Sequence, residues 1–348
     1  IYLNLGKFIM GDTMNHEVDL SKYEIRTDLV IEKDDKDFIN DEEIIDEIKI
    51  TKTKLNKDNL IKNKEKGTYI TIEFEDITDS NNYEKVKKIV INNLKYLIKE
   101  TKIKENDTCL IVGLGNKNST PDAIGPLTID NIIVTNHIYL YDELDPNYRR
   151  VSAIVPNVTA STGIETSEYI KGIVSILKPD FVIVIDALAS RSLKRVNKTI
   201  QMSNTGITPG SGIGNNRNEI SKNTLNIPVI AIGVPTVVDA VSVVVDTINF
   251  MEQHYAFYKE FLQLPLSKIV PSGQINYLNK KVNIDIEDNK KILGLIGTLS
   301  EDELRNLLFE VLTPINYNMI VTPKEVDFIV DKTSKLIGES INHSLHNI

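Results

Sequence analysis

Apolar and polar positions follow a regular order through the middle of the chain. Short apolar runs with the length of buried strands are separated by segments whose apolar residues recur at helical spacing. Apolar strands that alternate with helices are typical of a largely parallel sheet covered on both faces. The predicted fold class is therefore α/β, a three-layer αβα sandwich with a mostly parallel central sheet. The predicted strands are Cys109–Gly115, Val151–Val155, Phe181–Asp186, Thr199–Ser203 and Val229–Pro235, with helices near Asp122–His137, Glu165–Leu177 and Val237–Phe250.

The flanking parts of the chain have a different pattern. Gly67–Glu75 alternates apolar and polar residues as a half-buried strand does, and Tyr83–Lys99 has the spacing of an amphipathic helix. After Phe250 the pattern weakens, and two more helices are expected near Glu301–Leu312 and Pro323–His343. We expect four parts: a leading segment (1–28), a charged N-terminal part (29–108), a catalytic α/β core (109–260) and a C-terminal extension whose helices pack on the core (261–348).

Charge and cysteine content narrow the class of protein. The 40 Lys and Arg residues against 49 Asp and Glu residues give a net charge of −9, which argues against a nucleic-acid-binding surface. The single cysteine, Cys109, excludes an internal disulfide and fits a reducing compartment, and no apolar run is long enough to cross a bilayer. We expect a cytoplasmic protein with no direct nucleic-acid partner and no membrane association. The start codon could be Met10 or Met14.

Two carboxylates stand at the ends of predicted core strands. Asp186 ends one apolar strand, and Asp122 lies in the turn after another, directly behind Pro121. Open α/β sheets place ligands beyond the carboxyl ends of their strands. Two neighbouring carboxylates can divide acid and base roles, so peptide hydrolysis is the leading candidate reaction. Asp122 could instead stabilise a helix N-terminus, and Asp239, a third candidate, is interpreted as an early helical carboxylate.

Other chemistries lack their motifs. The string GLGNKN at residues 113–118 lacks the third glycine of a dinucleotide-binding fingerprint, and no GxxxxGK[ST] phosphate loop is present. The five histidines lack the HExxH spacing of a zinc peptidase. We therefore expect no metal and no cofactor.

Six separated motifs resemble one known family. They are VGLGNKNSTPDAIGP, TGIETSEYIKGI, KPDFVIVIDALASRS, GITPGSGIGN, IPVIAIGVPTVVDAVS and VTPKEVD. In this order, from about Tyr23 to the C-terminus, they resemble the germination protease family of spore-forming Firmicutes. The resemblance implies an endopeptidase that begins the degradation of small acid-soluble spore proteins in the forespore or spore core. It also implies a self-processing zymogen and a homotetramer.

The resemblance suggests roles for particular residues. Asp122 and Asp186 correspond to the two aspartates implicated in an atypical aspartic peptidase mechanism. The box IRTDL at residues 25–29 resembles the processing region, and we expect the cut between Asp28 and Leu29. A glycine-rich loop is expected to shape the substrate cleft, through Gly210, Ser211, Gly212 and Gly214.

Three alternatives stay open. The fold and the GLGN pattern also look like the hydrogenase maturation endopeptidases, which bind the nickel of their substrate through two acidic residues and a histidine. Here no histidine lies at a predicted strand end. An inactive homologue that only binds spore proteins is a second alternative. A nucleotide-processing enzyme is the third, and it would need phosphate or ribose contacts for which the sequence has no motif.

Overall fold

The computed structural model describes residues 27–32, 39–56, 64–140, 145–210, 217–263, 286–312 and 319–348. The chain divides into two compact units. The first comprises residues 26–238 and 321–348, and the second comprises residues 1–25 and 239–320. In the described part of the chain, no helix combines the length and the apolar character that a membrane span requires. The four-part division expected from the sequence stays a prediction.

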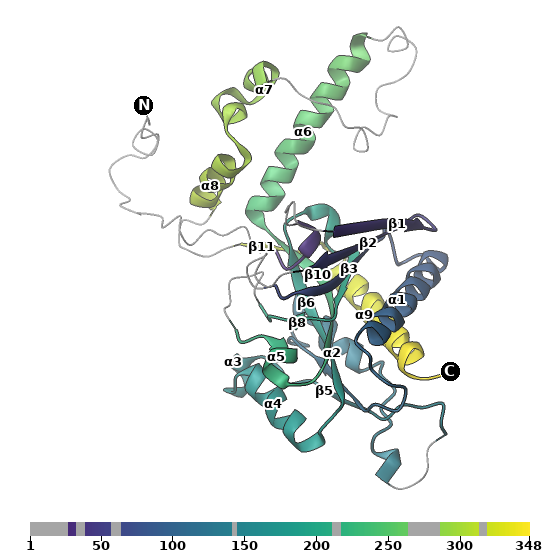
Figure 1. Cartoon of the computed structure of the whole chain (residues 1–348). Coiled ribbons are helices and arrows are strands. Elements are labelled where there is room, and N and C mark those ends of the chain that lie inside the picture. The colour runs from purple at the N-terminus through teal and green to yellow at the C-terminus, as the bar shows by residue number, and fades with distance from the viewer. Residues whose placement is uncertain are drawn as a thin grey trace. The chain divides into compact units, whose positions relative to one another are not determined.

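The first unit is built around one mixed sheet (Figure 1). Its strand order is β1-β2-β3-β7-β10-β6-β4-β5. Strands β10, β6, β4 and β5 pair in parallel, whereas β1, β2, β3, β7 and β10 are joined by antiparallel pairings. The predicted α/β class is confirmed, and the N-terminal strands add an antiparallel half to the parallel one. The strand bounds are β1 (Ile39–Ile45), β2 (Ile48–Leu55), β3 (Gly67–Glu73), β4 (Cys109–Gly113), β5 (Val151–Ile154), β6 (Phe181–Ser190), β7 (Thr199–Ser203) and β10 (Val229–Asp239).

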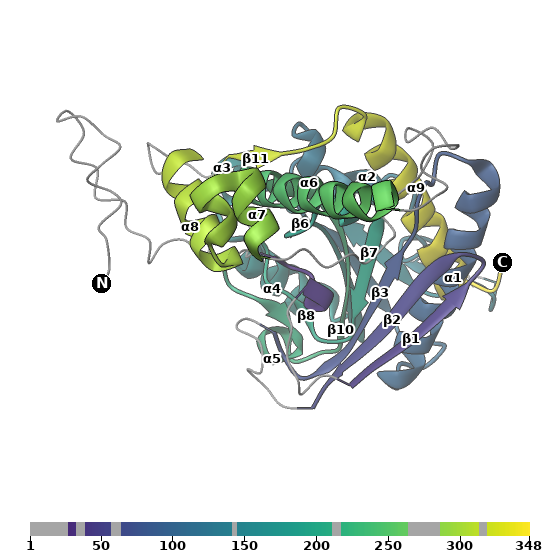
Figure 2. The same cartoon turned by 90° about the horizontal axis from the view of Figure 1, so that it is seen from above.

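Helices cover both faces of this sheet. On one face, α1 (Ser80–Glu100), α2 (Ile124–Ile129) and α9 (Val326–Leu345) share an apolar core with the sheet, and α1 and α9 lie side by side (Figure 1 and Figure 2). On the other face, α4 (Thr166–Leu177) and α5 (Lys222–Leu225) contribute to a second core. Successive residues of β4 and β6 belong to opposite cores because side chains alternate along a strand. The predicted three-layer αβα sandwich is therefore confirmed.

Short elements connect these layers. β8 (Gly206–Ile207) and β9 (Ile220–Ser221) pair with each other and lie on either side of the glycine-rich segment in sequence. The remaining short elements are η3 (Val30–Glu32), η4 (Thr120–Asp122), η5 (Ile138–Leu140), α3 (Thr159–Thr162) and η6 (Leu193–Arg195).

The second unit is helical. It contains α6 (Ala240–Gln263), α7 (Ile286–Leu293), η10 (Gly294–Thr298) and α8 (Glu301–Leu312), and β11 (Ile320–Val321) stands at its boundary. At the start of α6, the Ser242 backbone N–H and hydroxyl donate to the Asp239 carboxylate at 2.9 and 2.7 Å. Asp239 therefore caps α6, which confirms its interpretation as a helix carboxylate.

The predicted helix Asp122–His137 is wrong in length. The regular helix α2 ends at Ile129, and the chain continues in turns. The reason is tertiary, because the Asn342 side chain on α9 donates to the Asn131 carbonyl and accepts from the Ile133 N–H. These bonds replace helical hydrogen bonds and bind this stretch to α9. Cys109 is a buried strand residue, as predicted, and burial raises the pKa of its thiol.

Candidate active site

Asp186 lies on β6 at the point where the sheet loses a strand on one side. β4 pairs with β6 only as far as Ile185, whereas β10 stays beside β6 to its end. The Asp186 side chain is buried, and one of its oxygens accepts a hydrogen bond from the Ala187 N–H at 2.9 Å. Burial raises the pKa of Asp186 well above its ordinary value, and the negative charges of Asp122 and Asp28 raise it further. This carboxyl therefore retains its proton to a higher pH than a surface aspartate.

Asp122 reaches the same region through a tight turn after β4. The carbonyl of Asp122, at the end of η4, accepts from the Asn116 N–H at 3.1 Å. Gly115 has a φ of +107°, and a Cβ at this position would lie 2.0 Å from the Asp122 carbonyl oxygen and 3.0 Å from a carboxylate oxygen. Glycine is therefore required by both the backbone angle and the close approach. Burial also raises the pKa of Asp122, against the opposing effects of the Asn116 backbone and Arg217.

Arg217 was not predicted from the sequence. Its positive charge lowers the pKa of both Asp122 and Asp186, so it interacts with the two carboxylates at once. The only feature of the sequence that pointed to Arg217 was its position directly after the glycine-rich loop. In that loop Gly210 is described and has a φ of +69°. The predicted substrate-cleft residues Ser211, Gly212 and Gly214 lie outside the described residues, so the cleft stays a prediction.

The predicted cleavage position lies on the same part of β6. The Asp28 N–H donates to the Ala189 carbonyl at 3.0 Å, and the Ala189 N–H donates to the Asp28 carboxylate at 2.9 Å. Leu29 is fully buried. Since the charge of Asp28 contributes to the raised pKa of Asp186, the two carboxylates are close enough to interact. The structure thus brings Asp28, Asp122 and Asp186 together from three distant parts of the chain.

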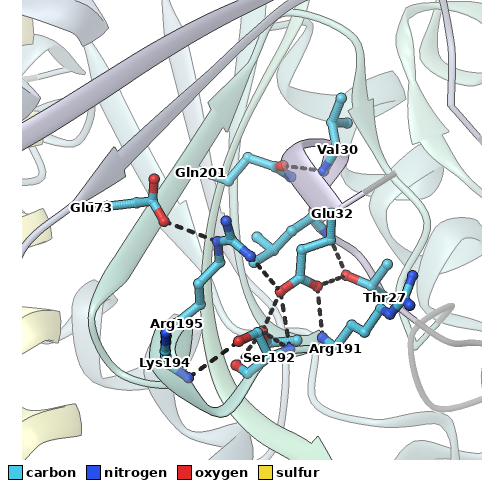
Figure 3. Close-up of polar contacts among 11 residues, drawn as sticks. Thr27, Val30, Glu32, Glu73, Arg191, Ser192, Lys194, Arg195 and Gln201 are labelled. Carbon is cyan, nitrogen blue, oxygen red and sulfur yellow. Dashed lines mark hydrogen bonds and ion pairs between the residues drawn. The ribbon is translucent and has the colours of Figure 1, made fainter. Parts of the chain in front are cut away.

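Gln201 on β7 holds the backbone on both sides of Leu29. Its Nε2 donates to the Asp28 carbonyl oxygen at 3.2 Å, and its Oε1 accepts from the Val30 N–H at 2.7 Å, a contact drawn in Figure 3. The Gln201 side chain is buried. One amide group therefore fixes the peptide bond between Asp28 and Leu29 in place. β7 alternates polar and apolar residues, so the sequence does not distinguish Gln201 from Thr199 and Ser203.

A pair of carboxylates with raised pKa values at the ends of sheet strands is a candidate functional site, because shifted pKa values cluster at such sites. The chain belongs to the germination protease family, whose model matches residues 16–348. It is 43% identical to the germination protease of Geobacillus sp. (strain WCH70), over 96% of each chain. It is 44% identical to the germination protease of Bacillus mycoides (strain KBAB4), over 96% of this chain and 97% of that one.

This membership confirms the family resemblance and identifies the protein as a protease of spore germination. Among solved structures, the [NiFe] hydrogenase maturation protease HycI from Thermococcus kodakarensis KOD1 matches with 15% sequence identity and a TM-score of 0.26. The match covers 41% of this chain and 79% of that chain.

Proposed function

We propose that the protein is an endopeptidase that starts the degradation of small acid-soluble spore proteins, and that it activates itself by cutting its own chain between Asp28 and Leu29. The observation that carries the proposal is the position of this bond. Asp28 is hydrogen-bonded to Ala189 on β6, three residues beyond the buried Asp186. The negative charge of Asp28 raises the pKa of the Asp186 carboxyl. Residues 1–28 are then a prosegment.

The proposed chemistry uses Asp122 and Asp186 as a pair that shares one proton. Burial and mutual repulsion favour this singly protonated form. The ionised member removes a proton from a water molecule, whose oxygen bonds to the Asp28 carbonyl carbon. The protonated member donates its proton to the Leu29 nitrogen as the carbon–nitrogen bond breaks. The products are a new carboxyl group on Asp28 and a new amino group on Leu29.

Two further contacts support this assignment. The Gln201 Nε2 donates to the Asp28 carbonyl oxygen, where negative charge develops as water attacks. The Leu29 N–H donates to the Thr27 hydroxyl at 3.0 Å, which orients the leaving nitrogen. Both contacts involve atoms of the peptide group that is cut.

Mass spectrometry of the purified full chain tests the proposal. We expect a processed form that begins at Leu29, and we expect this form to cut a small acid-soluble spore protein. A chain that stays intact, or that is cut at another bond, contradicts self-processing at Asp28. A chain that stays intact and binds the spore protein without cutting it supports the inactive homologue instead. We also propose that the protein is a homotetramer. Light scattering of the purified protein measures the mass of the assembly.

Gln201→Ala tests the positioning role of the amide. We expect self-processing to slow by roughly 10- to 100-fold, because the variant loses the hydrogen bond to a carbonyl that gains charge in the transition state. The rate is followed by gel or intact mass, and circular dichroism checks the fold. Asn92→Ala, which removes an exposed amide on α1, is the matched control and leaves the rate unchanged. Wild-type speed in Gln201→Ala rejects the role.

A further inference from the structure

A cavity of about 660 Å³ lies in the first unit, at the amino ends of strands β4 and β5. Three segments line it: the end of α1 with the turn that follows, the stretch before β5, and the end of α9. Asp122 follows the opposite end of β4, so the cavity is separate from the candidate active site. A volume of this size is typical of sites for small molecules. We call it the basic cavity.

The basic cavity gathers positive charge in a chain that is acidic as a whole. Of the described residues that line it, five are Lys or Arg and one is acidic, whereas the whole chain has a net charge of −9. Cations concentrated in a depression create a positive local potential that attracts anions. The cations are Lys95, Lys99, Lys102, Arg149 and Arg150, and the acidic residue is Glu105.

The fold does not use all the donors of the two arginines. The Arg149 side chain is buried, and its Nη1 donates to the carbonyl oxygens of Lys104 and Asp107 at 2.7 and 2.6 Å. The Nε atoms of both arginines are buried and have no hydrogen-bond partner in the described part of the chain. The Arg150 Cζ atom lies 4.7 Å from the centre of the Tyr139 ring. Since a guanidinium has five N–H donors, both arginines retain donors for a ligand.

The nearby carboxylates do not neutralise these cations. Within the residues that the structure describes, no ion pair joins any of the five to an aspartate or glutamate. Asp180 acts on Arg149 at longer range, but its carboxylate accepts from the Thr108 N–H and hydroxyl at 2.7 and 2.8 Å. The Asp107 carboxylate accepts from the Lys104 N–H at 2.8 Å. A buried cation without a paired anion is unfavourable, so an anion from outside is stabilised here.

Helix stability explains only part of this arrangement. Lys99 lies in the last turn of α1, where a cation is favourable beside the helix C-terminus. Arg149 fastens the turn after α1 through its Nη1 atom. Neither role accounts for Arg150, which comes from the stretch before β5 and has no carboxylate partner in the described residues.

We infer that the basic cavity is a binding site for a small molecule that carries phosphate. The planar guanidinium fork matches phosphate oxygens, and lysines add positive charge without a fixed geometry. Five cations exceed the charge of one carboxylate, so a phosphate group with two or more negative charges is the better fit. The inference is independent of the proposed peptidase reaction, because that reaction uses none of the residues that line the cavity.

A phosphate bound here joins the C-terminal end of the chain to the sheet. The last turn of α9 and the residues after it form one side of the cavity. On that side, the Asn347 N–H donates to the Asn147 carbonyl oxygen at 2.9 Å. The Arg149 N–H donates to His346 Nδ1 at 3.1 Å. A ligand that contacts both sides makes local opening rarer, and we expect saturating pyrophosphate to slow hydrogen exchange of residues 343–348 by roughly tenfold or more.

Calorimetric titration of the full chain with inorganic pyrophosphate, at constant ionic strength, tests the site. We expect one site per chain and a rise in Tm of roughly 2–5 °C at 100-fold excess over Kd, because the ligand binds only the folded chain. Arg150→Met and Lys102→Met each weaken binding by roughly tenfold or more, since each removes a charged donor. Lys88→Met, which changes an exposed lysine on α1 outside the cavity, is the control and leaves Kd unchanged. Circular dichroism checks the fold of each variant.

Two more probes, inorganic phosphate and adenosine monophosphate, distinguish the sources of the phosphate. Tightest binding of the nucleotide supports a phosphate ester, and tightest binding of phosphate or pyrophosphate supports an inorganic ion. Absence of saturable binding of all three probes overturns the inference, as does binding that Arg150→Met and Lys102→Met leave unchanged. A DNA duplex that binds through these residues while the small probes do not also overturns it, and assigns this face to nucleic acid.

Discussion

Asp186→Asn slows self-processing of the full chain by roughly 100- to 10,000-fold, the range expected for the loss of a group that transfers protons in the rate-limiting step. The amide has the shape of the carboxyl but can neither accept the proton of water nor return one to the Leu29 nitrogen. The rate is measured as loss of intact mass with time. Asp122→Asn is expected to have a similar effect, since the two carboxyls act as a unit.

The fold survives this substitution. Asp186 is buried beside two other carboxylates, so its negative charge is unfavourable in the folded protein and a neutral amide is not. The free energy of unfolding of Asp186→Asn at neutral pH is therefore equal to or higher than that of the wild type, as measured by urea unfolding. Asp130→Asn, which changes an exposed aspartate paired with Lys117, is the control and processes normally. A folded Asp186→Asn that processes at the wild-type rate rejects the carboxylate pair.

Self-processing accelerates as the pH falls from neutral toward the upper pKa of the pair. Burial and the charges of Asp122 and Asp28 raise the pKa of Asp186, so the singly protonated pair becomes more populated on acidification. While this proton titrates, the rate changes by up to about tenfold per pH unit. Processing is timed in buffers of equal ionic strength from neutral to mildly acidic pH. A rate that does not change over this range contradicts a shared proton.

The raised pKa of Asp186 also makes the stability of the folded chain depend on pH. A carboxyl with a raised pKa binds its proton more tightly in the folded chain than in the unfolded chain, so this contribution to stability is present at low pH and is lost as the pH rises through the folded-state pKa. Asp186→Asn removes that part of the pH dependence. Asp28→Asn removes one negative charge near Asp186, and we expect it to move the midpoint of the processing profile to lower pH.

Most of the first unit's fold could be predicted from local pattern. The strands β4, β5, β6 and β10 were expected from apolar runs, because a strand buried on both faces has few polar residues to interrupt it. β7, which alternates polar and apolar residues, was also expected. The lengths of individual elements were less well predicted. The stretch after Ile129 is rich in Asn and β-branched residues, which favour a helix only weakly, and Asn342, from the far end of the chain, forms hydrogen bonds with its backbone.

The site was predictable only in part. Asp122 and Asp186 were proposed as site residues because charged residues at the ends of apolar strands are conspicuous in a single sequence. Gln201, Arg217 and Glu32 were not identified, since each is an ordinary polar residue until its partners are known. The processing position was suggested by a family resemblance, and its contact with β6 became visible only in the structure.

The sequence by itself determined the α/β class and pointed to the two candidate carboxylates at the ends of apolar strands, because buried elements repeat apolar residues at fixed spacing. Only the tertiary structure decided that Asp28 is hydrogen-bonded to Ala189 on β6, that Gln201 bonds to the Asp28 carbonyl oxygen, and that donors of residues 190–195 surround Glu32. The physical reason is that hydrogen bonds and charge interactions act over a few ångströms of space. The contacts of Asp28, Val30 and Glu32 join residues that are more than 150 positions apart in sequence, and no local pattern predicts them.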